Sequence, residues 1–240
     1  YNNREFDIRN GAAVPPRITM RGVVDSLLHP RWLLGTLARY MIAEKGLPGQ
    51  PNIHIPEAYK GGQDYTAGEV QGFFSRNDTL DWDFLRRVRD LWPRTLLIKG
   101  VLHPDDAVKA AECGVDGIFV SNHGGNVLDM AAQPIEVLPA IVEAAGERLT
   151  IIVDSGFRRG SDVLKGLALG ADAVAIGRPM LYGVGAAGEP GARRALAILD
   201  AEIRRTMGNL GLCDIASLTR DYVLAPGDQP PSPIGETPNR

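Results

Sequence analysis

Four short apolar segments recur at even intervals between residues 96 and 177, and amphipathic stretches separate them. The apolar segments are residues 96–100, 117–122, 150–154 and 173–177. The stretches 104–113, 134–145 and 161–169 have helical spacing, with Pro104 in a first turn and Gly170 at a helix end. Continuous apolar strands alternating with amphipathic helices predict a parallel β-sheet covered by helices.

The polar chemistry gathers at the carboxyl ends of these predicted strands. Lys99, His123, Asp154 and Arg178 each follow or end an apolar segment, with glycine close by. Four such units at short, even spacing predict an α/β protein whose strands form half of a (β/α)8 TIM barrel. The functional residues of that fold lie at the carboxyl ends of its strands.

The remaining parts differ in kind. Residues 1–80 are rich in Pro, Gly and Asn, with one predicted helical stretch near residues 23–42, and residues 225–240 form a Pro-rich tail. We assign residues 81–224 to the half-barrel. In the stretch 23–42, Trp32 and neighbouring leucines stand beside Arg31 and Arg39, a pattern that suits either a helix lying on a membrane or one packed against protein.

Composition narrows the class of protein. At 240 residues and 44% hydrophobic, the chain is long enough for one large domain with its own core. A net charge of −3 without basic blocks argues against nucleic-acid binding. Two scattered cysteines indicate neither a disulfide framework nor a metal site. With no signal peptide or membrane-spanning run recognised, we expect a cytoplasmic protein.

Two strand ends carry the candidate reactive groups. His123 follows an apolar strand and precedes Gly124 and Gly125, whose missing side chains allow a ligand close to the backbone. Histidine at such a place can accept a proton from a substrate, or it can simply cap a strand-to-loop turn. Lys99 ends its strand as a cation, suited either to neutralising an anionic cofactor ring or to forming a Schiff base.

The last two strand ends predict a phosphate site. Asp154-Ser155-Gly156-Phe157-Arg158-Arg159-Gly160 follows the third strand and Gly177-Arg178-Pro179 the fourth. Glycines free backbone N–H groups for an anion, and arginines offer forked donors. TIM barrels frequently bind phosphate in the loops after strands 7 and 8, which these would be in the second half of a barrel. Arg158 and Arg178 are the stronger candidates, since Arg159 fits equally well as a surface residue.

Taken in order, these motifs resemble the C-terminal half, strands 5–8, of the FMN-dependent α-hydroxy acid dehydrogenase/oxidase family. Residues 29–32 and 83–92 are most similar to its bacterial lactate and mandelate dehydrogenase branches. Within that resemblance, residues 1–80 correspond to the long loop between strands 4 and 5. The motifs that carry it are Lys99-Gly100, Ser121-Asn122-His123-Gly124-Gly125, Leu128-Asp129, residues 154–162, Ala168-Leu169-Gly170-Ala171 and Gly177-Arg178.

The resemblance implies an oxidation of a 2-hydroxy acid to a 2-oxo acid, with a hydride equivalent passing to FMN. It makes His123 the active-site base, Lys99 the cation beside the flavin ring, and Arg4 a group that binds the substrate carboxylate and stabilises negative charge. Substrate binding would involve Arg4, His123 and Asn126. The implied cofactor-binding residues are Lys99, Ser121, Asp154, Gly156, Arg158, Gly177 and Arg178.

The chain departs from the family pattern at Asn126, where the family has a second carboxylate-binding arginine three residues after the histidine. An amide cannot form the charged bidentate clamp. Either Arg4 alone holds a hydroxy acid, or the substrate differs. A related branch of flavoproteins that mature peptide-derived cofactors such as mycofactocin carries Asn here and oxidises a carbon beside an amine. A non-catalytic phosphate-binding half-barrel is the third alternative.

The chain also matches only half of a barrel. Half of a parallel barrel exposes two sheet edges and an open apolar face. We therefore expect an N-terminal half-barrel polypeptide, in the same or a separate chain, to complete the fold. A homo-oligomer of the whole barrel is expected from the family. The segment 23–42 adds the alternative of peripheral contact with the inner face of the membrane.

Overall fold

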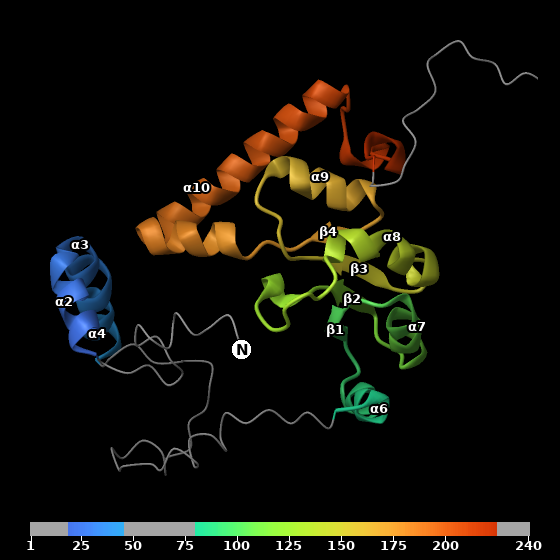
Figure 1. The fold of residues 1–240 in the computed structure, drawn as a ribbon, viewed down its shortest axis with the longest axis horizontal. Helices are drawn as coiled ribbons and strands as arrows, with labels where there is room; N and C mark the ends of the chain where they lie inside the picture. Colours follow the sequence, from blue (N-terminus) through green and yellow to red (C-terminus); the bar gives the residue numbers. More distant parts are fainter. Residues whose placement is uncertain (1–18, 46–79, 225–240) are drawn as a thin grey trace, which may run out of the picture. The chain divides into compact units, whose positions relative to one another are not determined.

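A computed structural model of the chain describes residues 19–45 and 80–224, which belong to two compact units, 1–79 and 80–240 (Figure 1). The described part of the first unit is mostly helical. It runs through α2 (Met20–Leu28), α3 (Pro30–Trp32), a π-helical segment η2 (Leu33–Ala38) and α4 (Arg39–Glu44).

The single helix expected over residues 23–42 is wrong in one respect, because the helix is interrupted at His29. That residue has φ −116° and ψ 65°, outside the helical region. The cause is Pro30, which has no N–H to donate and disfavours the helical conformation in the residue before it. Pro30 then begins α3 at a position where a missing N–H costs nothing.

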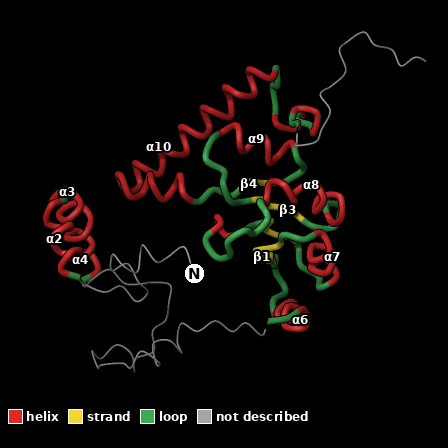
Figure 2. The backbone as a smooth tube through the Cα atoms, in the orientation of Figure 1, coloured by secondary structure: helices red, strands yellow, loops and turns green. Residues whose placement is uncertain are grey.

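The second unit is built on a four-stranded parallel sheet. The strands are β1 (Leu97–Val101), β2 (Gly117–Val120), β3 (Thr150–Val153) and β4 (Ala173–Val174), and their spatial order is their order in the chain. Helices α7 (Pro104–Glu112), α8 (Pro134–Ala145) and α9 (Gly160–Ala168) connect them, as Figure 2 shows, and α6 (Trp82–Leu91) precedes β1. Sequential strand order with the connecting helices on one side is the winding of a (β/α) barrel, which confirms the predicted fold class (Figure 1).

Two elements differ from the sequence prediction. β4 is paired over two residues, with β3, instead of the five expected. The helix expected from residue 193 begins earlier, as α10 (Arg178–Leu210), and is broken at Ala187 and Gly188. Glycines and Pro190 hide the helical pattern of its first part in the sequence.

The two faces of the sheet are unequal. Ile118 and Val120 in β2 and Ile151 and Val153 in β3 are fully buried, and they form the core with residues of α7 and α8. The opposite face carries Lys99, Phe119 and Ile152, the first two paired across β1 and β2 and the last two across β2 and β3, and none of these three is fully buried. The helices thus cover one face, while the other corresponds to the interior of a barrel.

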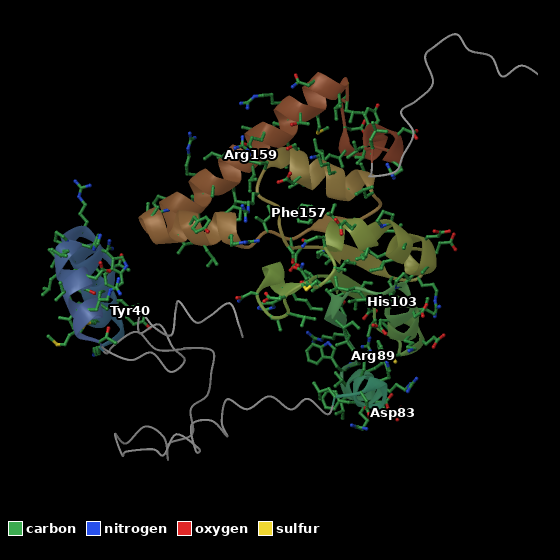
Figure 3. The ribbon with its side chains drawn as sticks, viewed as in Figure 1. Tyr40, Asp83, Arg89, His103, Phe157 and Arg159 are labelled. Atoms are coloured by element: carbon green, nitrogen blue, oxygen red, sulfur yellow. The ribbon has the colours of Figure 1, made fainter. Side chains whose placement is uncertain are left out.

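Aspartates clamp the amino ends of the strands. An Asp116 carboxylate oxygen accepts the N–H of Leu96 at 2.7 Å, and Asp172 accepts that of Ile151 at the same distance. Arg89 of α6 donates to the same Asp116 oxygen at 2.9 Å and lies beside this end of the sheet (Figure 3). The Leu96 hydrogen bond, followed by that of Arg89, lowers the pKa of Asp116 below its ordinary value of 3.8.

Helix α9 is capped by a side chain from another helix. A Glu202 oxygen from α10 accepts the N–H of Gly160, the first residue of α9, at 2.8 Å. The other oxygen pairs with Arg159 at 2.8 Å. A Cβ at Gly160 would lie 2.4 Å from the backbone nitrogen of Ile203, so only glycine allows α9 and α10 this close. The two helices therefore hold the loop after β3 at its far end.

Candidate functional site

Polar residues from three strand ends meet at the carboxyl edge of the sheet. Lys99 of β1 donates to the hydroxyl of Ser121, just after β2, at 2.6 Å. The same ammonium group lies 2.9 Å from a carboxylate oxygen of Asp154, just after β3. Ser121 is 2% exposed, while the Lys99 side chain is 45% exposed. An ammonium group held by Ser121 and Asp154, on a side chain that is still partly exposed, can serve an anionic group placed over this edge.

Asp154 is held as a carboxylate by its neighbours. Burial opposes ionisation and is the largest single effect, but hydrogen bonds from Ser121, Ser155 and Lys99, with the charge of Lys99, outweigh it together. The pKa of Asp154 therefore falls below its ordinary value of 3.8. Asp154 is thus ionised at neutral pH and lies against the Lys99 ammonium group.

His123 begins a tight turn above these groups. It starts the short 3-10 helix η4 (His123–Gly125), and its φ of 57° lies in the left-handed region that few non-glycine residues adopt. Its backbone N–H donates to Ser121 at 3.1 Å. Buried Asn122 accepts the N–H of Gly125 at 2.9 Å and donates to the carbonyl of Ala132 at 3.3 Å. The turn is anchored, and the imidazole is exposed.

Ser155 joins this turn to β3. Its hydroxyl donates to Asp154 at 2.7 Å and accepts the N–H of Gly124 at 3.0 Å. Ser155 belongs to the motif 154–160, but the motif alone predicts no role for it in the site. The signal that could have found it is its place between a strand-end aspartate and Gly156, where a left-handed turn is expected. Its φ is 74°.

The loop after β3 is rigidly held but leaves an open side. Phe157 is 6% exposed and packs against Gly166 of α9 (Figure 3). Gly156, with φ 88°, has no atom within 4 Å of the place a Cβ would take. Arg158 is exposed, and its backbone N–H donates to Asp162 at 3.1 Å. The arginine side chain is presented from a fixed backbone.

Gly177 and Arg178 complete this edge. Gly177 precedes the first turn of α10 and faces open space at its α-carbon, and Arg178 is the first residue of that helix. A nitrogen of the Arg178 guanidinium lies 3.8 Å from the place of a Cβ on Gly124, so Arg178 reaches the His123 turn. A helix N-terminus with an arginine favours an anion. Arg159, in contrast, turns to Glu202 of α10 (Figure 3).

Asn126 and Arg4 are the other two residues expected to bind the substrate. Asn126 ends the His123 turn and is half-buried. Arg4, and with it the first unit outside residues 19–45, lies outside the described residues. The structure thus brings together Lys99, Ser121, His123, Asp154 and Arg178, with Asn126 on the same turn.

Residues 19–45 and 80–224 lack both a metal-binding cluster and a membrane-spanning helix. No group of three or more His, Cys, Asp or Glu side chains there could hold a metal ion. Within the same residues, no helix has both the length and the apolar character needed to cross a membrane.

Comparison with known proteins identifies the family. The profile of the family described as FMN-dependent dehydrogenase matches residues 1–225. The chain is 40% identical over 234 residues to (S)-mandelate dehydrogenase of Pseudomonas putida, which covers 96% of the chain and 56% of that protein. It is 38% identical over 212 residues to L-lactate dehydrogenase of Caulobacter vibrioides, covering 88% of the chain and 53% of that protein.

A solved structure agrees with these sequence matches. The crystal structure described as that of the monotopic membrane protein (S)-mandelate dehydrogenase superposes with a TM-score of 0.78 at 40% identity, covering 92% of this chain and 56% of that one. The chain therefore spans little more than half the length of these relatives. On the family match and these relatives together, the chain belongs to the FMN-dependent dehydrogenases, a family of TIM-barrel flavoproteins related to the lactate and mandelate dehydrogenases.

Proposed function

We propose that this chain supplies the base and much of the FMN site of an enzyme that oxidises a 2-hydroxy acid to a 2-oxo acid. The observation that carries the proposal is the meeting of Lys99, Ser121, Asp154 and the His123 turn at the carboxyl edge of one parallel sheet. Family membership and the names of the relatives point to the same reaction.

The residues at this edge fit FMN. A flavin phosphate is a dianion, and Arg158 and Arg178 stand at two neighbouring loops, the second at a helix N-terminus. Gly156 and Gly177 leave open space where side chains would block a ribityl chain or phosphate. Asp154, an ionised acceptor, suits the hydroxyl groups of a ribityl chain, and exposed Lys99 suits the electron-rich edge of the ring.

His123 takes the proton in this scheme. The chemistry that FMN supplies when bound is acceptance of a hydride equivalent from the substrate carbon. The exposed imidazole accepts the accompanying proton, so that the hydroxy acid loses two electrons and two hydrogens and becomes a 2-oxo acid. The Lys99 ammonium group would offset the negative charge that develops beside it.

Arg4 and Asn126 would bind the substrate carboxylate. Arg4 offers a charged fork, while Asn126 offers one neutral amide at the end of the His123 turn. The same amide supports a second candidate, in which the substrate is an amine or peptide-derived molecule without a carboxylate at this point. An amide can accept a hydrogen bond from an amine N–H, which an arginine cannot.

The remaining proposals concern what completes the protein. β1 and β4 are the edges of the described sheet, and the barrel fold of the family has eight strands, so an N-terminal half-barrel polypeptide would pair with both edges. The whole barrel would form a homo-oligomer. Leu28 and Leu34 in the first unit are 72% and 66% exposed. With a relative described as monotopic, they support a cytoplasmic enzyme held at the inner face of the membrane by residues 23–42.

Anaerobic titration tests the function. The protein, co-produced with any polypeptide that completes the barrel and loaded with FMN, is mixed with (S)-mandelate, with L-lactate and with a panel of amines while the flavin absorbance is followed. Bleaching by a hydroxy acid supports the proposal, and bleaching by amines alone supports the second candidate. A protein that binds no FMN would contradict both.

A further inference from the structure

We propose that Ser155 is a positioning residue for His123, tying the turn that carries the base to the Lys99–Asp154 ion pair. The proposal rests on the proposed function for its catalytic meaning, although the tie itself is a property of this chain. Ser155 follows β3, and the turn follows β2, so the two are 31 residues apart in sequence at the bond that joins them.

The backbone is strained on both sides of that hydrogen bond, at His123 and at Ser155. Among residues 19–45 and 80–224, four non-glycine residues have positive φ: Lys45, His123, Met130 and Ser155. Two of these four, His123 at 57° and Ser155 at 74°, lie in turns that one hydrogen bond connects. Glycine would adopt the conformation of Ser155 without strain, yet the chain has a hydroxyl there. The hydroxyl, which glycine lacks, forms two hydrogen bonds that can offset this strain.

The Ser155 hydroxyl donates one hydrogen bond and accepts another, and the direction of each is fixed. The Asp154 carboxylate accepts hydrogen bonds only, so the single hydrogen of Ser155 points to it, across 2.7 Å. The oxygen lone pairs then accept the N–H of Gly124 at 3.0 Å. Because Asp154 stays ionised through the neutral range, this arrangement has one orientation. Ser155 therefore fixes the position of Gly124 and not merely its solvation.

The hydrogen bonds around Ser155 and the Lys99–Asp154 ion pair close a ring. Lys99 contacts Ser121 and Asp154, Asp154 accepts from Ser155, and Ser155 holds the amide of Gly124. Ser121 in turn accepts the N–H of His123 at 3.1 Å. The two successive amides of His123 and Gly124 are thus held by two different strand ends. Without Ser155, the Gly124 amide would lose this partner, and Gly124, which has positive φ, would move more easily between the neighbouring amides that Ser121 and Asn122 hold.

Displacement of a reacting group by about 1 Å can cost on the order of a hundredfold in rate. The imidazole follows its backbone, so loss of the tie should slow proton transfer. Arg4, which would supply the charged contact to the substrate carboxylate, is not part of this turn, and Asn126 at its end would contribute one neutral hydrogen bond. The expected effect is a fall in kcat of about 10- to 100-fold with KM changed by less than about threefold. A residue that served stability alone would not produce this separation of kcat from KM.

Two substitutions at Ser155 separate positioning from stability. Ser155→Ala removes the hydroxyl and keeps the strain, whereas Ser155→Gly removes both. Positioning predicts that both lower kcat to a similar extent in the FMN-loaded protein, although Ser155→Gly has the higher melting temperature of the two. Ser217→Ala is the matched control, since the Ser217 hydroxyl also donates to an aspartate, Asp214, at 2.9 Å, but far along the chain at an exposed 3-10 helix. It should leave kcat unchanged.

A measurement without turnover tests the tie directly. In hydrogen exchange followed by NMR, the Gly124 amide should exchange at least about tenfold faster in both Ser155 variants than in the wild-type protein. The Asp154 amide, which donates to Val120 in the sheet, serves as the internal reference and should not change.

The outcomes are distinct. Wild-type kcat in Ser155→Gly, or unchanged exchange of the Gly124 amide in both variants, overturns the proposal. If the wild-type protein oxidises none of the hydroxy acids or amines, the proposed function fails. The exchange comparison then still decides whether Ser155 holds the turn.

Discussion

Glu202 of α10 holds the N-terminus of α9 through two contacts, and its removal should destabilise the protein well beyond a surface substitution. Its side chain is 15% exposed, and its two carboxylate oxygens accept the Gly160 amide and pair with Arg159. Glu202→Ala removes both contacts at once. Glu202→Gln keeps an oxygen for Gly160 but removes the charge.

The magnitude follows from three contributions. Leaving the N–H of buried Gly160 without an acceptor costs about 1–3 kcal/mol. Losing a negative charge at the N-terminus of α9 costs about 0.3–1 kcal/mol. The pair with Arg159, whose side chain is 70% exposed, contributes at most about 1 kcal/mol. Glu202→Ala should therefore lower the free energy of unfolding by about 2–4 kcal/mol, and Glu202→Gln by about 1 kcal/mol.

Urea unfolding followed by circular dichroism measures both values, provided that the m-value stays constant. Glu189→Ala is the control, because Glu189 also pairs with an arginine of α10, Arg193, but both side chains are more than 70% exposed. It should change stability by less than about 0.5 kcal/mol. If Glu202→Ala is no more destabilising than Glu189→Ala, or if Glu202→Gln costs as much as Glu202→Ala, the capping argument fails.

Three further changes test other parts of the structure. Gly160→Ala should cost about 1–3 kcal/mol in urea unfolding, since its Cβ would lie 2.4 Å from the backbone of Ile203, and a variant as stable as wild type would show that α9 and α10 are not this close. The lowered pKa of Asp116 adds stability above its ordinary value of 3.8 that is lost as pH falls through the lower folded pKa. Asp116→Asn, which weakens the hold on the Leu96 amide, should therefore flatten the acid limb of stability against pH; an unchanged limb would contradict this. Asn126→Arg should lower KM for a hydroxy acid by about tenfold through a charged contact, and no change would show that the carboxylate binds elsewhere.

The sequence predicted those parts of the fold that depend on local pattern. The apolar runs that became β1, β2 and β3 are continuous and bounded by glycine, so their ends were predicted to within about two residues. The first half of α10 was missed, because its glycines and Pro190 disguise a helix that packs closely against the second half at Gly183 and Gly191. The interruption at His29 was missed although Pro30 marks it.

The contacts of the site, like the elements of the fold, include some that the sequence predicts and some that it does not. The meeting of Lys99 and Asp154 follows from parallel strands, whose carboxyl ends share one edge, and could be anticipated from the two strand ends. The roles of Ser155 and Glu202 could not. Each depends on a partner amide from a segment 31 or 42 residues away, and only the packed structure shows which amide lies opposite which side chain. The role of a polar residue in a loop depends on the hydrogen-bond partner that another segment of the chain brings to it.

We propose above that His123 is the base of a flavin-dependent oxidation at the carboxyl edge of this sheet. Anaerobic stopped-flow reduction of the FMN-loaded protein by (S)-mandelate or L-lactate, compared between wild type and His123→Ala, tests it most directly. We expect rapid bleaching in the wild type and, in the variant, retained FMN with a reduction rate lower by about 10²- to 10⁴-fold. Equal rates of reduction in the two proteins would contradict it.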